Sequence, residues 1–352
     1  MLKTILSGDK PRSRVLSAVL LAILVGLALA PFIFLGARGL NAAAKICIFV
    51  VLVASYDLLL GYTGIVSFAH TMFFGIGAYG VAIALSRLPA LWTSIVIGVA
   101  GALVVSTVLA LAIGLFSLRV KAIFFAMITL AVASAFATLA SQLADFTGGE
   151  DGLSFKVPEL LSPGFRFGEQ PFLGITPDGK LITYYLVFVA ALVLFLLLLR
   201  IVNSPFGRVL QAIRENPLRA EALGYRTVVY RTLSSVLAAL FATLAGALLA
   251  LWLRYNGPDT SLSFEIMIDI LLIVVIGGMG TMYGAVIGST LFIIAQSFLQ
   301  DAMKLASDAT SAIPPLSNLL HPDRWLLWLG VLFILSVYFF PSGIVGRLRG
   351  KS

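Results

Sequence analysis

Long uncharged apolar runs, separated by short polar segments, dominate the pattern of this 352-residue chain. Most of the runs are close to the ~20 residues that a helix needs to cross ~30 Å of hydrocarbon. They lack the alternation of polar and apolar positions that is typical of membrane-barrel strands. The pattern therefore predicts an all-α integral membrane protein, a polytopic bundle of about ten transmembrane segments, two of them short or interrupted by glycine. The runs lie at about 15–35, 40–60, 68–86, 90–118, 122–144, 181–200, 233–253, 265–276, 284–303 and 324–340.

The first run raises the question of a cleaved leader. It follows a basic segment, and Ala28-Leu29-Ala30 resembles a signal-peptidase site. The uncharged run nevertheless continues through Pro31 to Leu35, which makes it long enough to span a membrane. We therefore expect a retained first span, with a cleaved signal peptide as the alternative.

Composition and charge narrow the class. Apolar residues make up 60% of the chain and charged residues 11%, which excludes a water-soluble domain. The net charge is +8, and in a membrane chain a basic excess indicates cytoplasmic loops rather than nucleic-acid binding. With ten spans, both ends of the chain lie on the same side of the membrane. The arginine-rich loop at 200–232 follows an even number of spans and lies on that side too. We predict cytoplasmic tails at 1–14 and 341–352 around one transmembrane domain at 15–340. The arginines of the loop are Arg200, Arg208, Arg214, Arg219, Arg226 and Arg231.

Candidate catalytic and metal-binding residues are scarce. The single Cys47 excludes an intrachain disulfide, and the two histidines lie far apart in the sequence. Asp57 and Asp269 are the only acids well inside apolar segments, and we place them, like Lys45, near span ends, where charged groups can reach the interface. We therefore expect no catalytic residue, no cofactor bound by this chain and no metal site.

Two glycine patterns imitate nucleotide-binding motifs. The stretch 75–80 fits GxGxxG, but no strand precedes it and it lies in an apolar run, so we expect close helix packing there. The stretch 346–352 ends in Gly-Lys-Ser with the wrong glycine spacing and no following helix, so it is interpreted as a basic tail.

The longest predicted outside segment is the loop at 145–180. It is rich in glycine, proline and acidic residues, and Gly148-Gly149 and Asp151-Gly152 are turn signals. It is interpreted as a solvated connector, or alternatively as a docking surface or gate on the extracytoplasmic face.

The loop at 200–232 carries signals for two short helices. Ser204 and Pro205 form a cap-and-proline start, and Asn216-Pro217 repeats that start. An apolar stripe at helical spacing follows the first start, and Gly224 is suited to the end of the second helix. A structured elbow of this size predicts docking to a soluble partner; a helix lying on the membrane surface is the alternative. The stripe consists of Phe206, Val209, Leu210 and Ile213.

Glycine also indicates a transport path and packed helices. The segments 60–64 and 276–280 interrupt apolar runs, and such breaks in pairs point to a translocation path. Small residues spaced by four predict closely packed helix faces. The path candidates are Gly61, Gly64, Ser67, Gly277, Gly278 and Gly280, and the packing candidates are Gly280, Gly284 and Gly288, together with Ala238, Ala242, Gly246 and Ala250.

Five blocks then carry a resemblance to a known family. They are LLLGYTGIVSFAHTMFFGIGAY (58–79), LRVKAIFFAMITLA (118–131), DFTGGEDGLS (145–154), SPFGRVLQAIRENPLRAEALG (204–224) and VIGGMGTMYGAVIGS (275–289). In this order they resemble the branched-chain amino-acid ABC transporter permeases of the Liv M-subunit type. The resemblance implies a subunit of a bacterial inner-membrane importer. Its implied partners are a second permease of the Liv H type, two ATPase subunits that use ATP and Mg²⁺, and a periplasmic binding protein.

The resemblance also implies roles for particular residues. The Glu-Ala-x-Gly core of the family's ATPase-facing loop matches Glu221, Ala222 and Gly224, with Leu223 between them, and Gly207 and Arg214 match positions just upstream. Glu150 before Asp151 departs from relatives, which leaves urea, short amides or small organic acids open as substrates. An ion-coupled secondary transporter is the alternative from another class, although the elbow would have no task in it.

Overall fold

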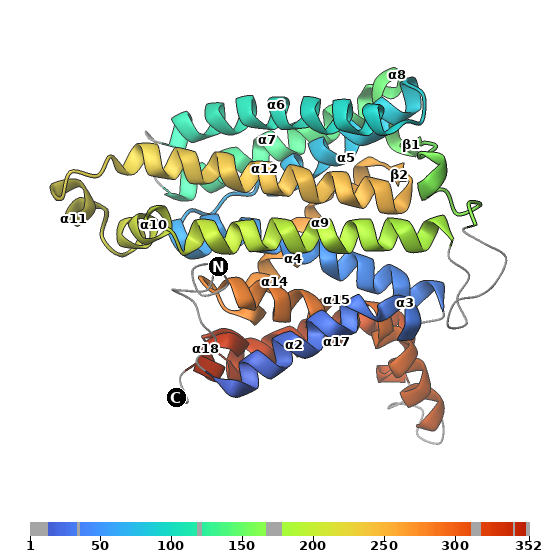
Figure 1. Cartoon of the computed structure of the whole chain (residues 1–352). Helices are drawn as coiled ribbons and strands as arrows, with labels where there is room; N and C mark the ends of the chain where they lie inside the picture. Colours follow the sequence, from blue (N-terminus) through green and yellow to red (C-terminus); the bar gives the residue numbers. More distant parts are fainter. Residues whose placement is uncertain are drawn as a thin grey trace.

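The structure is a bundle of long helices that lie side by side (Figure 1). This computed structural model describes residues 13–33, 36–117, 122–166, 178–310, 318–340 and 342–349. Most of the predicted tail at 1–14, with Lys3, Lys10 and Arg12, therefore lies outside the described residues, as do residues 341 and 350–352. Most of the other predicted tail, 341–352, is described and forms the helix Gly343–Arg349.

The long helices correspond one by one to the predicted spans. Eight helical segments of the described chain are long and apolar enough to cross a membrane, which confirms an all-helical polytopic membrane protein. Helices α2 and α5 are outside that group, since α2 has only 15 residues and α5 has polar ends. The helices are α2 (Arg14–Ala28), α4 (Ala37–Thr63), α5 (His70–Arg87), α6 (Trp92–Ser117), α7 (Ala122–Gln142), α9 (Gly179–Val202), α12 (Thr227–Leu253), α14 (Phe264–Gly277), α15 (Met282–Ala309) and α17 (Trp325–Phe339).

Shorter elements connect the long helices. They are α3 (Ala30–Ile33), α8 (Ala144–Thr147), α10 (Pro205–Glu215), α11 (Pro217–Ala222), α13 (Pro258–Ser261), α18 (Gly343–Arg349), three 3₁₀ turns (Gly149–Asp151, Glu159–Leu161 and Pro322–Arg324) and the strands β1 (Leu153–Ser154) and β2 (Tyr255–Asn256).

The first span differs from the single long helix that the sequence predicts. Helix α2 ends at Ala28, and the chain resumes as the short α3. Pro31 has no N–H to donate to the carbonyl of Leu27, four residues earlier. The hydroxyl of Tyr184 on α9 donates to this carbonyl instead, at 2.6 Å, so a neighbouring helix stabilises the break.

The core of the bundle consists of α4, α5 and α12. In the membrane-spanning windows, 89% of α4 and 78% of α12 are buried, against 28% for α6 and 17% for α7. Glycines make the central contacts close: a Cβ on Gly77 would overlap the backbone of Thr243, and one on Gly246 would overlap that of Phe74. The GxGxxG stretch therefore packs α5 against α12, as predicted.

The loop that follows α7 folds over one end of the bundle. Strand β1 pairs antiparallel with β2, with Leu153 opposite Asn256, and the side chains of Phe155, Val157 and Leu161 are buried against α5 and α12. The prediction of a solvated connector is wrong for this part, because apolar side chains anchor it. The rest of the loop, 167–177, lies outside the described residues.

The bundle thus has two distinct ends (Figure 1). Helices α10 and α11, the start of α2 and helix α18 lie at one end, which we call the elbow end. Strands β1 and β2 lie at the other, the hairpin end. Helix α18 contacts α2, so the first and last described helices meet near the elbow, as the parity of the predicted spans requires.

Candidate functional site

The first helix of the elbow, α10, is fixed to the bundle by its apolar stripe. Leu210 and Ile213 are fully buried, and Phe206 stacks on Tyr230 of α12 with ring centroids 5.7 Å apart. Gly207 lies so close to the end of α9 that a Cβ would overlap the backbone of Val202. The apolar stripe of α10 therefore packs against the bundle of this same chain.

The caps of the elbow are partly as predicted. Asn216 accepts a hydrogen bond from the backbone N–H of Arg219 at 3.0 Å, which caps α11. Ser204 occupies the N-cap position of α10, but its hydroxyl donates back to the carbonyl of Ile201 at 2.6 Å. The side-chain cap predicted for Ser204 is therefore wrong, because the end of α9 offers a nearer acceptor.

Helix α11 ends in a Schellman motif centred on Gly224. This glycine has φ +90°, and its N–H bonds the carbonyl of Glu221 at 2.9 Å. The N–H of Tyr225 bonds the carbonyl of Ala220 at 3.1 Å, which completes the motif. The carboxylate of Glu221 also accepts a hydrogen bond from the hydroxyl of Thr227 at 2.6 Å. Glu221 thus has a partner within the chain that sequence reasoning missed.

Helix α11 and the residue after it expose two leucines next to polar side chains. The side chains of Leu218 and Leu223 are 78% and 72% exposed, and α11 projects from the left end of the bundle in Figure 1. Beside it lies an open groove of about 530 Å³ that includes Glu221, Gly224 and Tyr225. Ala222 is exposed at the same tip. The residues matched to the family's coupling loop therefore lie on two sides, with Gly207 and Arg214 toward the bundle and 221–224 toward the surroundings.

Arg214 joins the elbow to two helix ends, at a place that we call the glycine junction (Gly61 and Gly280 with Asp57 and Arg214). Its guanidinium donates to the backbone carbonyl of Gly61, in the last turn of α4. The backbone N–H of Gly280, between α14 and α15, donates to the carboxylate of Asp57 at 2.9 Å. Asp57 is only 2% exposed, so our placement of this side chain at the interface is wrong. The backbones of Gly61 and Gly280 instead enclose the carboxylate, and they pack so closely that a Cβ added to Gly61 would overlap Gly280.

The remaining path candidates lie around this junction. Gly64 caps the end of α4 with φ +71°, and Ser67 is buried in the connection to α5. Gly277 is the last residue of α14 and Gly278 follows it with φ +110°. The glycine segments therefore end α4 and α14 rather than interrupt longer helices, and the two ends meet in space.

The packing candidates divide in the same way. Gly284 and Gly288 lie in α15, where a Cβ would come within 2.9 Å of Gly277 and within 2.5 Å of the carbonyl of Ile273, both on α14. Gly280 does not share that helical face, because it precedes the helix with φ +78°. The four-residue spacing placed it on the wrong element, and its close contact is with Gly61 instead.

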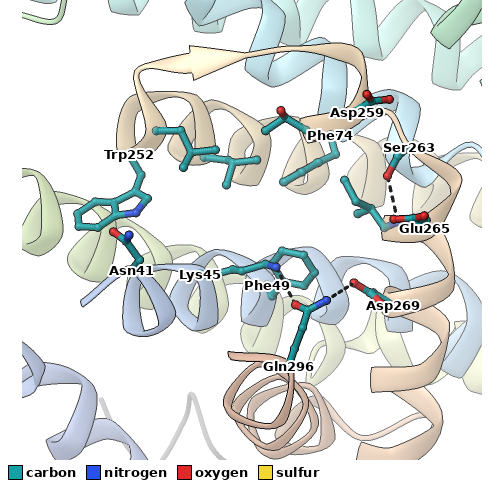
Figure 2. Close-up of a pocket in the computed structure, with 14 residues that line it drawn as sticks. Asn41, Lys45, Phe49, Phe74, Trp252, Asp259, Ser263, Glu265, Asp269 and Gln296 are labelled. Carbon is teal, nitrogen blue, oxygen red and sulfur yellow. Dashed lines mark hydrogen bonds between the residues drawn. The ribbon is translucent and has the colours of Figure 1, made fainter. Parts of the chain in front are cut away.

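At the hairpin end, charged side chains surround a cavity of about 340 Å³ (Figure 2). Lys45 of α4 donates to the amide oxygen of Gln296 at 2.8 Å, and the amide nitrogen of Gln296 lies 3.5 Å from the carboxylate of Asp269 on α14. We expected Lys45 and Asp269 each to lie near a span end. The structure joins them through Gln296, a polar residue inside an apolar run that sequence reasoning missed.

His70 has a partner other than the Ser67 near it in sequence. Its Nε2 atom lies 2.9 Å from the hydroxyl of Ser55 on α4 and 3.3 Å from the carbonyl of Leu52, and its ring is buried against Tyr56. These contacts join α4 to α5. Among the described residues no group of three His, Cys, Asp or Glu side chains is placed to hold a metal ion.

Comparisons with known proteins identify the family. Residues 39–337 match the family model described as branched-chain amino acid transport system / permease component, and the chain belongs to this family. It is therefore a multi-pass, non-catalytic permease component of an ABC transport system.

Particular relatives are similar over most of the chain. The high-affinity branched-chain amino acid transport system permease proteins LivM of Salmonella typhimurium and Escherichia coli are each 25% identical over 332 residues, covering 90% of this chain and 72% of theirs. A probable branched-chain amino acid transport permease protein LivM of Methanocaldococcus jannaschii is 26% identical over 324 residues, covering 83% and 88%. No solved structure matches the chain.

Proposed function

We propose that this chain is a pore-forming subunit of an ATP-driven importer that moves branched-chain amino acids from the periplasm to the cytoplasm. It lies in a bacterial inner membrane with both ends in the cytoplasm. A second permease of the Liv H type completes the pore, two ATPase subunits bind at the elbow end, and a periplasmic binding protein delivers the substrate. ATP and Mg²⁺ are used by the ATPase subunits, and this chain itself binds no cofactor.

The observation that carries the proposal is the contact of Arg214 with Gly61. Because α10 is packed on the bundle and α11 presents leucines outward, a partner that displaces α11 also displaces α10. The guanidinium of Arg214 transmits this displacement to the glycine junction, where α4 and the turn between α14 and α15 meet. The elbow is thus a rigid connection between a docking surface and the end of the predicted path.

The charged groups of the bundle are the feature that the alternative from another class, an ion-coupled secondary transporter, would use. Such transporters place ionisable groups inside the bundle, as Asp57, Lys45 and Asp269 are placed here. The docking face of α11 has no task in that scheme. Uptake by the purified chain alone in proteoliposomes would favour the alternative, whereas the importer requires every partner for uptake and for ATP hydrolysis.

The test is affinity purification of a tagged chain from its native membrane. We expect the wild-type chain to recover a second permease and ATPase subunits. The double variant Leu218→Ala with Leu223→Ala should lower ATPase recovery about tenfold while the second permease is retained, since truncation of contact leucines weakens an interface. The matched control is Leu305→Ala, which removes a leucine that is 72% exposed near the other end of the bundle. Equal ATPase recovery in all three samples would contradict docking at α11.

A further inference from the structure

The cavity at the hairpin end is lined by one cationic side chain and by several carboxylates (Figure 2). Lys45 enters it from α4, and its ammonium lies 5.3 Å from the ring centroid of Phe49. Asp269 and Glu265 enter it from α14, and Asp259 from α13. A ligand in this cavity therefore has a cation on one side and carboxylates on the other.

The rest of the lining combines apolar and aromatic side chains with the polar side chains of Asn41, Thr260, Ser263 and Gln296. Phe49, Phe74, Leu249 and Trp252 come from three helices of the bundle core. A volume of about 340 Å³ is within the range of small-molecule sites, which are typically apolar with a few placed polar groups. The cavity therefore offers an apolar wall beside the two charged walls.

Gln296 shows what the charged walls can bind. Its amide oxygen accepts from Lys45, as a carboxylate oxygen does, and its amide nitrogen is directed at Asp269, as an ammonium is. One neutral side chain thus supplies an acceptor to the cation and a donor to the anion. Charges inside a span cost free energy and are usually functional, so a ligand with both charges complements this pair better than the amide does.

We propose that this cavity is a transit site for a zwitterionic α-amino acid with an apolar side chain. The ligand's carboxylate pairs with Lys45, its ammonium pairs with Asp269, and its side chain lies against Phe49, Phe74 and Trp252. The assignment rests on the proposed import function and deepens it, because urea, short amides and simple organic acids lack one or both of the charges that the walls recognise.

The first experiment uses the wild-type chain in lipid nanodiscs and ligand-observed saturation-transfer NMR. L-leucine should give a binding signal at millimolar concentration. The probe 4-methylpentanoate lacks the ammonium, 3-methylbutylamine lacks the carboxylate, and urea lacks both charges, so each should bind at least about tenfold more weakly. No L-leucine signal, or equal signals from the single-charge probes, would overturn the proposal without any variant being made.

The second experiment uses variants with the same size-exclusion profile as the wild type. Lys45→Met and Asp269→Asn should each weaken L-leucine binding about tenfold, while Lys45→Arg, which keeps the cation, should retain most of it. The matched control is Asp301→Asn, which removes a carboxylate from an exposed ion pair with Arg38 outside the cavity. Wild-type binding in Lys45→Met and Asp269→Asn would overturn the assignment.

The readouts keep this proposal separate from the import function. Binding to the nanodisc sample requires no ATPase and no binding protein, whereas import is measured by partner recovery and ATP-dependent uptake. Uptake with intact partner recovery but no binding at the cavity leaves the importer standing and removes the transit site. Binding of L-leucine without ATP-dependent uptake would support the binding site and contradict the import function.

Discussion

At the elbow end a buried carboxylate and a guanidinium bind backbone groups of two glycines, whereas at the hairpin end charged side chains line an open cavity. Asp57 accepts from the N–H of Gly280, and Arg214 donates to the carbonyl of Gly61. Lys45 and Asp269 are bridged only by the amide of Gln296, with space beside them. Charged side chains inside the bundle thus bind backbone groups in a closed contact at one end, and at the other end they line a space that can hold a ligand.

The difference arises from the residues beside the charges. Glycines at the elbow end let backbones approach so closely that a single Cβ would overlap them, and this leaves no volume for a ligand. At the hairpin end the aromatic side chains of Phe49, Phe74 and Trp252 line a cavity instead. Lys45 and Gly61 are 16 residues apart on α4, roughly 24 Å along a helix. The proposed path therefore requires the junction to open, whereas the proposed transit site requires no such change at the cavity.

The largest expected effect comes from forcing the closed end apart. Gly284→Leu places a side chain where a Cβ already comes within 2.8 Å of the carbonyl of Gly277. Overpacking of this kind costs on the order of 3 kcal/mol, so we expect poor assembly rather than altered substrate preference. The measurement is recovery of the permease complex by size-exclusion chromatography together with its melting temperature.

The matched control for that variant is Gly101→Leu on α6. Gly101 is exposed, and nothing lies within 4 Å of a Cβ built on it. The same residue is therefore introduced into a helix without a clash, and the expected change is within about 0.5 kcal/mol. Normal assembly of Gly284→Leu, or equal losses in the two variants, would contradict the assignment of close packing to the α14–α15 contact.

A smaller effect is expected from cutting the connection between elbow and junction. Arg214→Ala removes the donor to Gly61 but leaves the buried stripe of α10 in place. Loss of a hydrogen bond from a charged group corresponds to about 1.5–3 kcal/mol. We expect binding-protein-stimulated ATP turnover to fall about tenfold while ATPase recovery stays normal.

Arg208→Ala is the matched control for Arg214→Ala, since Arg208 is an exposed arginine of the same helix. It should keep most of the stimulated turnover. An equal decrease in both variants would show that the elbow needs positive charge in general, and the specific contact with Gly61 would then lose its assigned role.

The sequence predicts what local patterns determine. The spans follow from apolar runs, and the cap at Asn216 and the end of α11 at Gly224 follow from residues a few positions apart. The contact of Arg214 with Gly61 joins positions 153 residues apart, and that of Lys45 with Gln296 joins positions 251 apart. The pattern within one segment does not indicate which helix ends meet in space. The sequence therefore identified the individual glycines but did not predict that they form one junction.

Two wrong predictions have the same origin. Asp57 was placed at the interface by its distance from the end of its own run, because burial by other helices is invisible in that run. The break after Ala28 likewise needs Tyr184, a residue of α9, to bond the carbonyl that Pro31 leaves without a partner. Helix existence is therefore a local property in this chain, whereas helix ends and buried charges depend on tertiary contacts.

The smallest expected effect is at Gly224, where a side chain would strain the backbone without a steric clash. Its φ is +90°, yet a Cβ built there has no heavy atom within 4 Å. Gly224→Ala should therefore cost only about 1 kcal/mol, and Gly224→Val more, because L-residues disfavour this region. We expect faster hydrogen exchange at 217–226 and a loss of ATPase recovery of about fivefold in Gly224→Ala, with the bundle's melting temperature unchanged. A melting temperature lowered as far as in Gly284→Leu would show that the elbow and the junction fold as one unit, and the contrast between the closed junction and its exposed connection would then fail.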